Sequence, residues 1–245
     1  FPWHPHRGIE TITYVLSGTV EHADSLGNNG LLGDGDIQWM TAGSGIIHQE
    51  MPKGNNKGEM HGFQLWANLP SNQKMTAPRY QDIQSKEIKS LVEDDGTVVK
   101  VIAGNYRGYN GPVDGIAAEP EYLDIYIPPL KFKKFPFDTR RQGFAYIFEG
   151  EGNFHNASSP VGVKVEKEFQ GEEIELRDLS GNRTLVVFDG GDEVAVQAGE
   201  NGVRFLLISG IPIKEPVAWH GPIVMNSKEE LRQAFNELNN GTFIK

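Results

Sequence analysis

The residues with the clearest capacity for chemistry form two short motifs. His4-Pro-His6 lies close to the start of the chain, and His48-Gln-Glu50 follows later. In an extended strand, residues two positions apart project their side chains from the same face. Each motif therefore directs two potential ligands to one side, and two such strands lying side by side would bring three imidazoles and one carboxylate together.

Nitrogen and oxygen ligands of this kind favour a divalent transition metal. The chain has no cysteine, so a thiolate site is excluded. Fe(II), Mn(II), Ni(II), Cu(II) and Zn(II) all accept such ligands, and the ligand types alone do not select one of them. Because proline at position 5 cannot donate to a sheet ladder, His4 and His6 are expected near the rim of a sheet. A metal at a rim can keep a coordination position open for an incoming molecule.

The elements that must position these residues are predicted to be β-strands. The sequence has 29 glycines and 14 prolines, which divide it into short runs rich in β-branched and aromatic residues. Helices of the kind that connect parallel strands are not evident, so the pattern favours an all-β barrel or jelly roll over a parallel α/β sheet. The clearest strand predictions are residues 11–16, 35–40, 62–69, 98–103, 123–127, 143–148, 184–188 and 203–208.

One helix is predicted near the C-terminus. Ser227 and Glu230 form a Ser-x-x-Glu capping box, and apolar residues follow at helical spacing within residues 227–239. The single apolar stripe of this helix is better explained by packing on a barrel than by docking of a partner.

A polar segment divides the chain. Residues 78–95 are mixed and charged, so the predicted domains are residues 1–84 and residues 85–245, with the helix in the second. A loose similarity between residues 8–18 and 143–150 favours two copies of one barrel.

Composition limits the classes of partner. The 33 acidic residues exceed the 23 basic ones, and the net charge of −10 argues against direct binding to nucleic acid. Uninterrupted apolar runs stay well short of the roughly 20 residues that a membrane-spanning helix requires. We therefore expect a cytoplasmic protein without a membrane anchor or, in a eukaryote, one that is also nuclear.

Several segments together resemble the pirin family of the cupin superfamily. The segments that carry the resemblance are residues 4–14, 22–25, 35–45, 48–52, 61–69 and 220–226. The resemblance implies a bicupin, that is, two consecutive cupin-type β-barrels, with an N-terminal segment that precedes Phe1 in full-length members. It also implies a single Fe(II) in the N-terminal barrel. The ligands carried over from the family motif are His4, His6, His48 and Glu50.

Other polar residues receive weaker assignments. Glu10 occupies the carboxylate position of the general cupin motif, and we assign it to support a ligating imidazole from outside the metal's ligand set. His22, beside Asp24, is interpreted as a hydrogen-bonded surface histidine rather than a substrate contact. His61 is equally consistent with a core histidine and with a residue that supports a ligand or contacts substrate. His155 has no second histidine near it in sequence, so no metal is expected in the second barrel.

The resemblance implies two functions of different classes. The first is a quercetin 2,3-dioxygenase, which opens a flavonol ring with O2 and releases carbon monoxide. In this function Glu50 would also be the general base toward the flavonol hydroxyl. The alternative is a non-enzymatic, redox-sensitive regulator that binds a transcription factor or a metabolic enzyme.

The residue types in the walls of the predicted pocket help to distinguish between classes of substrate. A sugar isomerase on the same barrel would require polar walls, whereas a flavonol would be accepted by aromatic ones. Four large apolar residues form a candidate aromatic lining, although each by itself is better explained as core: Trp3, Trp39, Met40 and Phe63.

Overall fold

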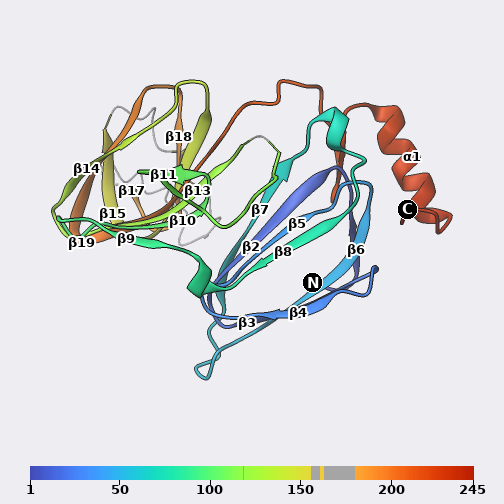
Figure 1. Cartoon of the computed structure of the whole chain (residues 1–245), viewed down its shortest axis with the longest axis horizontal. Coiled ribbons are helices and arrows are strands. Elements are labelled where there is room, and N and C mark those ends of the chain that lie inside the picture. The colour runs from blue at the N-terminus through green and yellow to red at the C-terminus, as the bar shows by residue number, and fades with distance from the viewer. Residues whose placement is uncertain (118, 156–160, 163–179) are drawn as a thin grey trace, which may run out of the picture. The chain divides into compact units, whose positions relative to one another are not determined.

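The computed structural model describes residues 1–117, 119–155, 161–162 and 180–245. Within this part of the chain the elements are almost all β-strands, and helix α1 (Lys228–Asn239) lies near the C-terminus (Figure 1). All eight predicted strands overlap strands of the structure. The hydroxyl of Ser227 accepts a hydrogen bond from the Glu230 amide and completes the capping box, so the helix begins where the sequence predicted. None of the described helices is long and apolar enough to cross a membrane.

The chain divides into two compact units. The first consists of Phe1–Glu87 together with Ile213–Lys245, and the second of Ile88–Pro212. The division near Glu87 lies close to the predicted boundary at residue 84, but helix α1 belongs to the first unit and not to the second. The physical reason is an apolar cluster in which Ala234 of the helix packs with Ile223, Met225 and Phe243 and against Ile47.

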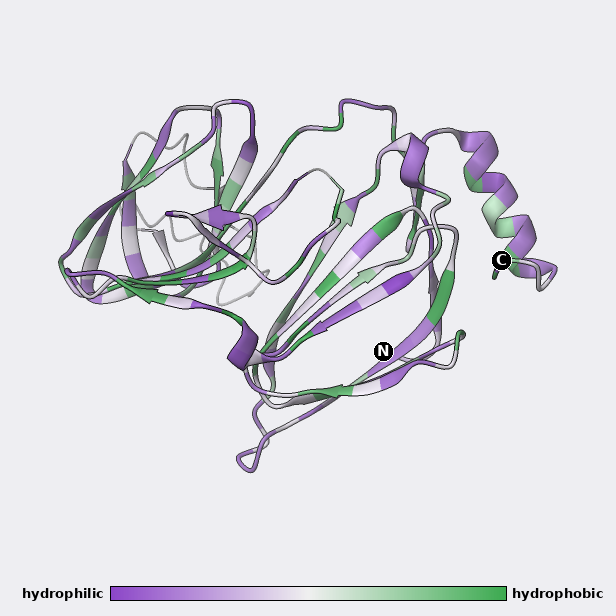
Figure 2. Cartoon of the chain, viewed as in Figure 1, coloured by the Kyte–Doolittle hydropathy of each residue, from purple (hydrophilic) through white to green (hydrophobic). Residues whose placement is uncertain are grey.

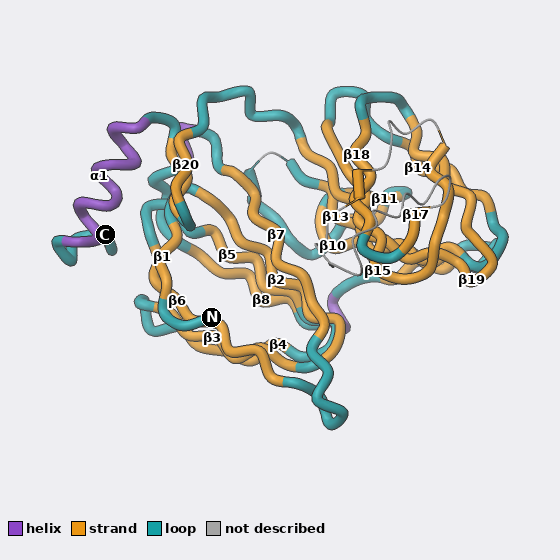
Figure 3. Tube along the Cα trace, turned by 180° about the vertical axis from the view of Figure 1, so that it is seen from behind, coloured by secondary structure: helices purple, strands orange, loops and turns teal. Residues whose placement is uncertain are grey.

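Two four-stranded antiparallel sheets face each other in the first unit (Figures 1 and 3). One sheet has the order β1 (His4–His6), β6 (Ile46–Lys53), β3 (Thr19–Asp24), β4 (Asn29–Leu32). The other has the order β7 (His61–Asn68), β2 (Ile9–Ser17), β5 (Ile37–Thr41), β8 (Arg79–Ile83). Hydrophilic and hydrophobic residues are interspersed along these strands (Figure 2).

Short elements complete the first unit. They are the 3-10 helices η1 (Ser71–Gln73) and η2 (Ser85–Glu87) and the hairpin of β20 (Ala218–His220) and β21 (Ile223–Met225). Ile223 forms a parallel bridge with Arg7, and the amide of Val224 donates to the carbonyl of Arg7 at 3.0 Å. The C-terminal segment is therefore bonded to the chain directly after the first histidine motif.

In the described residues of the second unit, the main sheet has nine strands. Its main path is β16 (Val161–Gly162), β18 (Thr184–Phe188), β15 (Gln142–His155), β19 (Glu193–Gly210), β13 (Glu121–Ile127), β10 (Val98–Ala103), β9 (Ser90–Val92). The remaining strands are β14 (Phe132–Pro136) on β19, β17 (Ser180–Gly181) on β15, and the pair β11 (Asn105–Tyr106) and β12 (Tyr109–Asn110). Phe135, Phe154 and Phe205 pack together in the core of this unit.

A buried arginine joins the C-terminal segment to the strand that carries the first motif. Arg7 is 2% exposed, and its guanidinium donates to Glu237 Oε2 at 2.8 Å and to the carbonyl of Phe243 at 2.7 Å. The same guanidinium lies 4.1 Å from the centre of the Phe243 ring. Because Arg7 follows His6 directly in the chain, its hydrogen bond to Glu237 of helix α1 helps to fix the position of His6.

Glu237→Gln is expected to lower the unfolding free energy of the first unit by about 2 kcal/mol at pH 7, since Arg7 loses a charge-assisted hydrogen bond. Hydrogen bonds from Lys245, Gln233 and Arg7 lower the pKa of Glu237 from 4.5 to about 2. A carboxyl group with a lowered pKa in the folded state contributes stability above pH 4.5 and loses it as the pH falls toward 2. The difference between wild type and variant should therefore shrink over that range.

Urea unfolding followed by tryptophan fluorescence measures this difference. All four tryptophans lie in the first unit, at positions 3, 39, 66 and 219, so the signal reports that unit alone. Glu229→Gln, on an exposed position of the same helix, is the matched control. A difference that stays constant between pH 4.5 and 2 would contradict the role of the Glu237 charge.

Candidate metal centre

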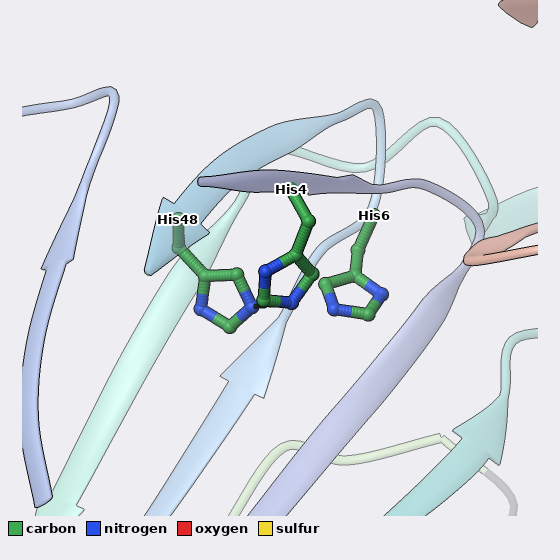
Figure 4. Close-up of side chains that lie close together, drawn as sticks. All are labelled: His4, His6 and His48. Atoms are coloured by element: carbon green, nitrogen blue, oxygen red, sulfur yellow. Dashed lines mark hydrogen bonds between the residues drawn. The ribbon is translucent and has the colours of Figure 1, made fainter. Parts of the chain in front are cut away.

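The two histidine motifs lie on adjacent antiparallel strands. His4 of β1 is directly opposite His48 of β6 in the ladder. The rings of His4, His6 and His48 converge on one region (Figure 4), and one nitrogen of each lies within 4.8 Å of the others. The Nε2 atoms of His4 and His48 are 3.0 Å apart. The structure thus brings together the three histidines that the sequence singled out.

Burial makes these histidines suitable for binding a cation. His6 and His48 are each 1% exposed, and neither ring nitrogen of His6 has a hydrogen-bond partner of normal geometry. Burial, together with the neighbouring His4, lowers the pKa of His6 to about 4. Burial followed by the charges of His6 and His4 lowers the pKa of His48 to about 3. His6 and His48 are therefore neutral at pH 7, and a neutral imidazole has a nitrogen lone pair that can bind a metal, so the donor set fits a divalent transition metal.

Glu50 lies on the same strand as His48 but has its own partners. It is 4% exposed, and it is not among the described residues whose ligand atoms cluster within 4.8 Å. Its Oε1 accepts hydrogen bonds from Thr13 Oγ1 at 3.1 Å and from Gln64 Nε2 at 3.1 Å. Its Oε2 also accepts from Gln64 Nε2, at 3.0 Å. The predicted fourth ligand is therefore held by residues of the facing sheet.

His22 is buried, which corrects its interpretation as a surface residue. It is 5% exposed and lies opposite Glu50 in the ladder between β3 and β6. Gln38 Nε2 donates to His22 Nε2 at 2.8 Å and to Asp82 Oδ1 at 2.9 Å. The ring of Tyr80 stacks on His22 at 5.9 Å. The reason for the difference is that β3 pairs with β6, which brings His22 into the barrel on the same face as Glu50.

Glu10 and His61 do not lie among the clustered histidines. Glu10 is buried and accepts a hydrogen bond from Thr41 Oγ1 at 2.7 Å. Strand alternation places it on the opposite face of β2 from Thr13, whose hydroxyl reaches Glu50. His61 begins the edge strand β7, where it is exposed and packs against Phe63 with ring centres 5.4 Å apart, so it is not a core histidine.

Most of the four residues predicted to form an aromatic lining do not point into the barrel interior. Trp39 and Phe63 alternate with Gln38 and Gln64 along their strands, so they lie on the face opposite to the polar interior. Trp3 is 52% exposed. Met40 is buried in an apolar cluster with Ala42, Ile46 and Tyr80. As a group, these residues do not form the pocket wall that the sequence suggested.

Three residues near the centre were missed from the sequence. Trp66 packs edge-on against His6 with ring centres 5.2 Å apart, and Thr13 and Gln64 bind Glu50. Gln64 and Trp66 alternate with Phe63 and Leu65, so the two faces of the strand at 61–68 were distinguishable in the sequence. Only the pairing of β7 with β2 shows which of these faces points toward the histidines.

Comparisons with known proteins agree with this architecture. Residues 1–67 match the family model described as Pirin, and residues 122–244 match the Pirin C-terminal cupin domain. A pirin-like protein of Caulobacter vibrioides is 41% identical over 244 residues, which cover 99% of this chain and 80% of that protein. Pirin-1 of Arabidopsis thaliana is 40% identical over 243 residues, which cover 98% of this chain and 77% of that protein.

A solved structure extends the similarity to three dimensions. The crystal structure of quercetin 2,3-dioxygenase from Acinetobacter baumannii has a TM-score of 0.82 and 30% identity. The match covers 98% of this chain and 78% of that one. This similarity and the two family models show that the fold, with its many strands and its C-terminal helix, is a bicupin. On this evidence the chain belongs to the pirin family of the cupin superfamily.

Proposed function

We propose that the protein is an iron-dependent quercetin 2,3-dioxygenase, which cleaves a flavonol with O2 and releases carbon monoxide. The observation that carries the proposal is the convergence of three imidazoles, with His6 and His48 buried and their pKa values lowered, and a buried carboxylate on the same strand as His48. The similarity to the Acinetobacter baumannii quercetin 2,3-dioxygenase supports the choice of reaction.

The residues take distinct roles in this proposal. His4, His6 and His48 hold the metal, and Glu50 is the fourth ligand. When bound, Fe(II) supplies a centre at which the flavonol oxygen and O2 are brought together and activated. Glu50 also accepts the proton of the flavonol 3-hydroxyl, because it is a carboxylate within the same barrel interior.

Trp66 contributes the apolar contact at this site. It is 43% exposed, and its ring makes an edge-to-face contact with His6, so part of the ring remains available to an aromatic substrate. The neighbouring positions on the same sheet, Thr13 and Gln64, are polar. We therefore propose that the flavonol binds with an aromatic ring against Trp66 and its hydroxyl-bearing edge toward Glu50.

Anaerobic loading with Fe(II), followed by addition of O2 and quercetin, tests the proposal. We expect loss of the flavonol absorbance with uptake of O2 and release of carbon monoxide in equal amounts. Metal-free protein in the same buffer is the control. Fe(II)-loaded protein that leaves quercetin intact, or that consumes it without releasing carbon monoxide, would overturn the proposed reaction.

A further inference from the structure

The carboxylate of Glu50 is held unevenly by its hydrogen bonds. A carboxylate offers about four lone-pair positions, two on each oxygen. Oε1 accepts two hydrogen bonds, from Thr13 and Gln64, whereas Oε2 accepts one, from Gln64. The nitrogen of Gln64 bridges the two oxygens, so Oε1 has one hydrogen-bond donor more than Oε2, the hydroxyl of Thr13. The two oxygens are therefore chemically different.

The two donors come from a rigid part of the fold. Thr13 of β2 and Gln64 of β7 lie directly opposite each other in the ladder between these strands. Glu50 approaches them from β6, which belongs to the facing sheet. The donors are thus fixed by main-chain pairing on one side of the barrel, while the carboxylate belongs to the strand that also carries His48.

We propose that Thr13 and Gln64 are positioning residues that orient Glu50, so that it meets the metal through Oε2 alone. This inference depends on the metal centre of the proposed function, but not on the substrate or the reaction. Both donors are uncharged groups, and the amide of Gln64 fixes the plane of the carboxylate by bridging its two oxygens. Without Thr13 the two oxygens have the same donor and become equivalent, and without Gln64 the plane of the carboxylate is no longer fixed.

Gln64→Leu and Thr13→Val test the proposal, because each removes donors with little change in side-chain size. Gln64 is itself exposed to solvent, so the leucine variant is expected to fold. Gln49→Leu is the matched control, since Gln49 adjoins Glu50 on the same strand and points to the opposite face. The probe is Co(II), whose visible absorption reports the number and geometry of its ligands.

Titration with Co(II) is expected to show an affinity about 10-fold lower for Gln64→Leu, as is typical when a partner of a metal ligand is removed. We also expect a change in the Co(II) absorption spectrum, a smaller change of the same kind in Thr13→Val, and no change in Gln49→Leu.

A double-mutant cycle separates positioning from a general loss of structure. In a Glu50→Gln background, Gln64→Leu should alter the affinity for Co(II) less than about 2-fold, because the two residues act through one interaction. A full 10-fold loss in that background would overturn the proposal, as would unchanged affinity and spectrum in the single variant. Neither assay contains flavonol or O2, so failure of the dioxygenase proposal would leave these measurements unaffected.

Discussion

His6→Ala is expected to abolish tight metal binding and, with it, turnover of quercetin. His6 is 1% exposed and makes ring contacts with both other histidines, with ring centres 4.9 Å from His4 and 5.0 Å from His48. Partners that only support a ligand typically change metal affinity 10–100-fold, so removal of a ligand itself should cost more than about 100-fold. His4, His48 and the carboxylate of Glu50 would remain, so the metal would lose one of its four proposed protein ligands.

Competition titrations with Fe(II) and Co(II) measure the loss, and quercetin consumption under air measures its effect on turnover. His61→Ala is the matched control, because it removes a histidine of the same barrel that lies outside the clustered group. The control variant should bind metal as the wild type does. Equal affinity in His6→Ala and wild type would show that the three histidines are not the metal site.

Lys74→Met is expected to destabilise the first unit by about 3 kcal/mol. Lys74 is 2% exposed, and its ammonium donates to the carbonyl oxygens of Gly8 and Val224, each at 2.9 Å, and to Asn68 Oδ1 at 2.8 Å. Each acceptor left without a donor costs about 1–3 kcal/mol. Burial of the charged ammonium acts in the other direction, because it destabilises the folded wild type. It lowers the pKa of Lys74 from 10.5 to about 8, which corresponds to a cost of about 3 kcal/mol that the methionine variant no longer has. The three lost hydrogen bonds outweigh that cost.

The same pKa predicts the dependence of stability on pH. Between pH 8 and 10.5 the folded protein releases the proton of Lys74 while the unfolded chain retains it, so the unfolded state binds more protons. The unfolding free energy of the wild type should therefore rise over this range relative to that of Lys74→Met. Tryptophan fluorescence in urea reports both values, with Lys86→Met at an exposed site as the control. A variant as stable as the wild type at pH 7 would contradict the role of the three hydrogen bonds.

The secondary structure followed largely from local patterns. Glycine and proline mark the turns, and the runs rich in β-branched and aromatic residues between them overlap strands of the structure at all eight predicted positions. The capping box at Ser227 located the start of the helix for the same local reason. The helix belongs to the first unit, although the sequence analysis placed it in the second domain. Packing of Ala234 against Ile223 and Phe243 depends on how the chain folds back on itself, which a local pattern does not reveal.

The candidate site divides in the same way. Spacing of two residues was sufficient to select His4, His6 and His48, since a strand presents such residues on one face whatever its surroundings. The environment of Glu50 could not be derived in this way. Its partners come from β2 and β7, and only the register of Thr13 with Gln64 brings both donors to one carboxylate.

The sequence by itself determined the residue types able to bind a cation, the absence of thiolates, the strand-rich character and the family resemblance, because these depend on identity and short-range spacing. The tertiary structure decided that His22 is buried, that Trp66 contacts His6, and that Arg7 is held by Glu237 of a helix at the other end of the chain. The physical reason is that burial and hydrogen-bond partners arise from strand pairing and packing between distant segments, which no local pattern encodes.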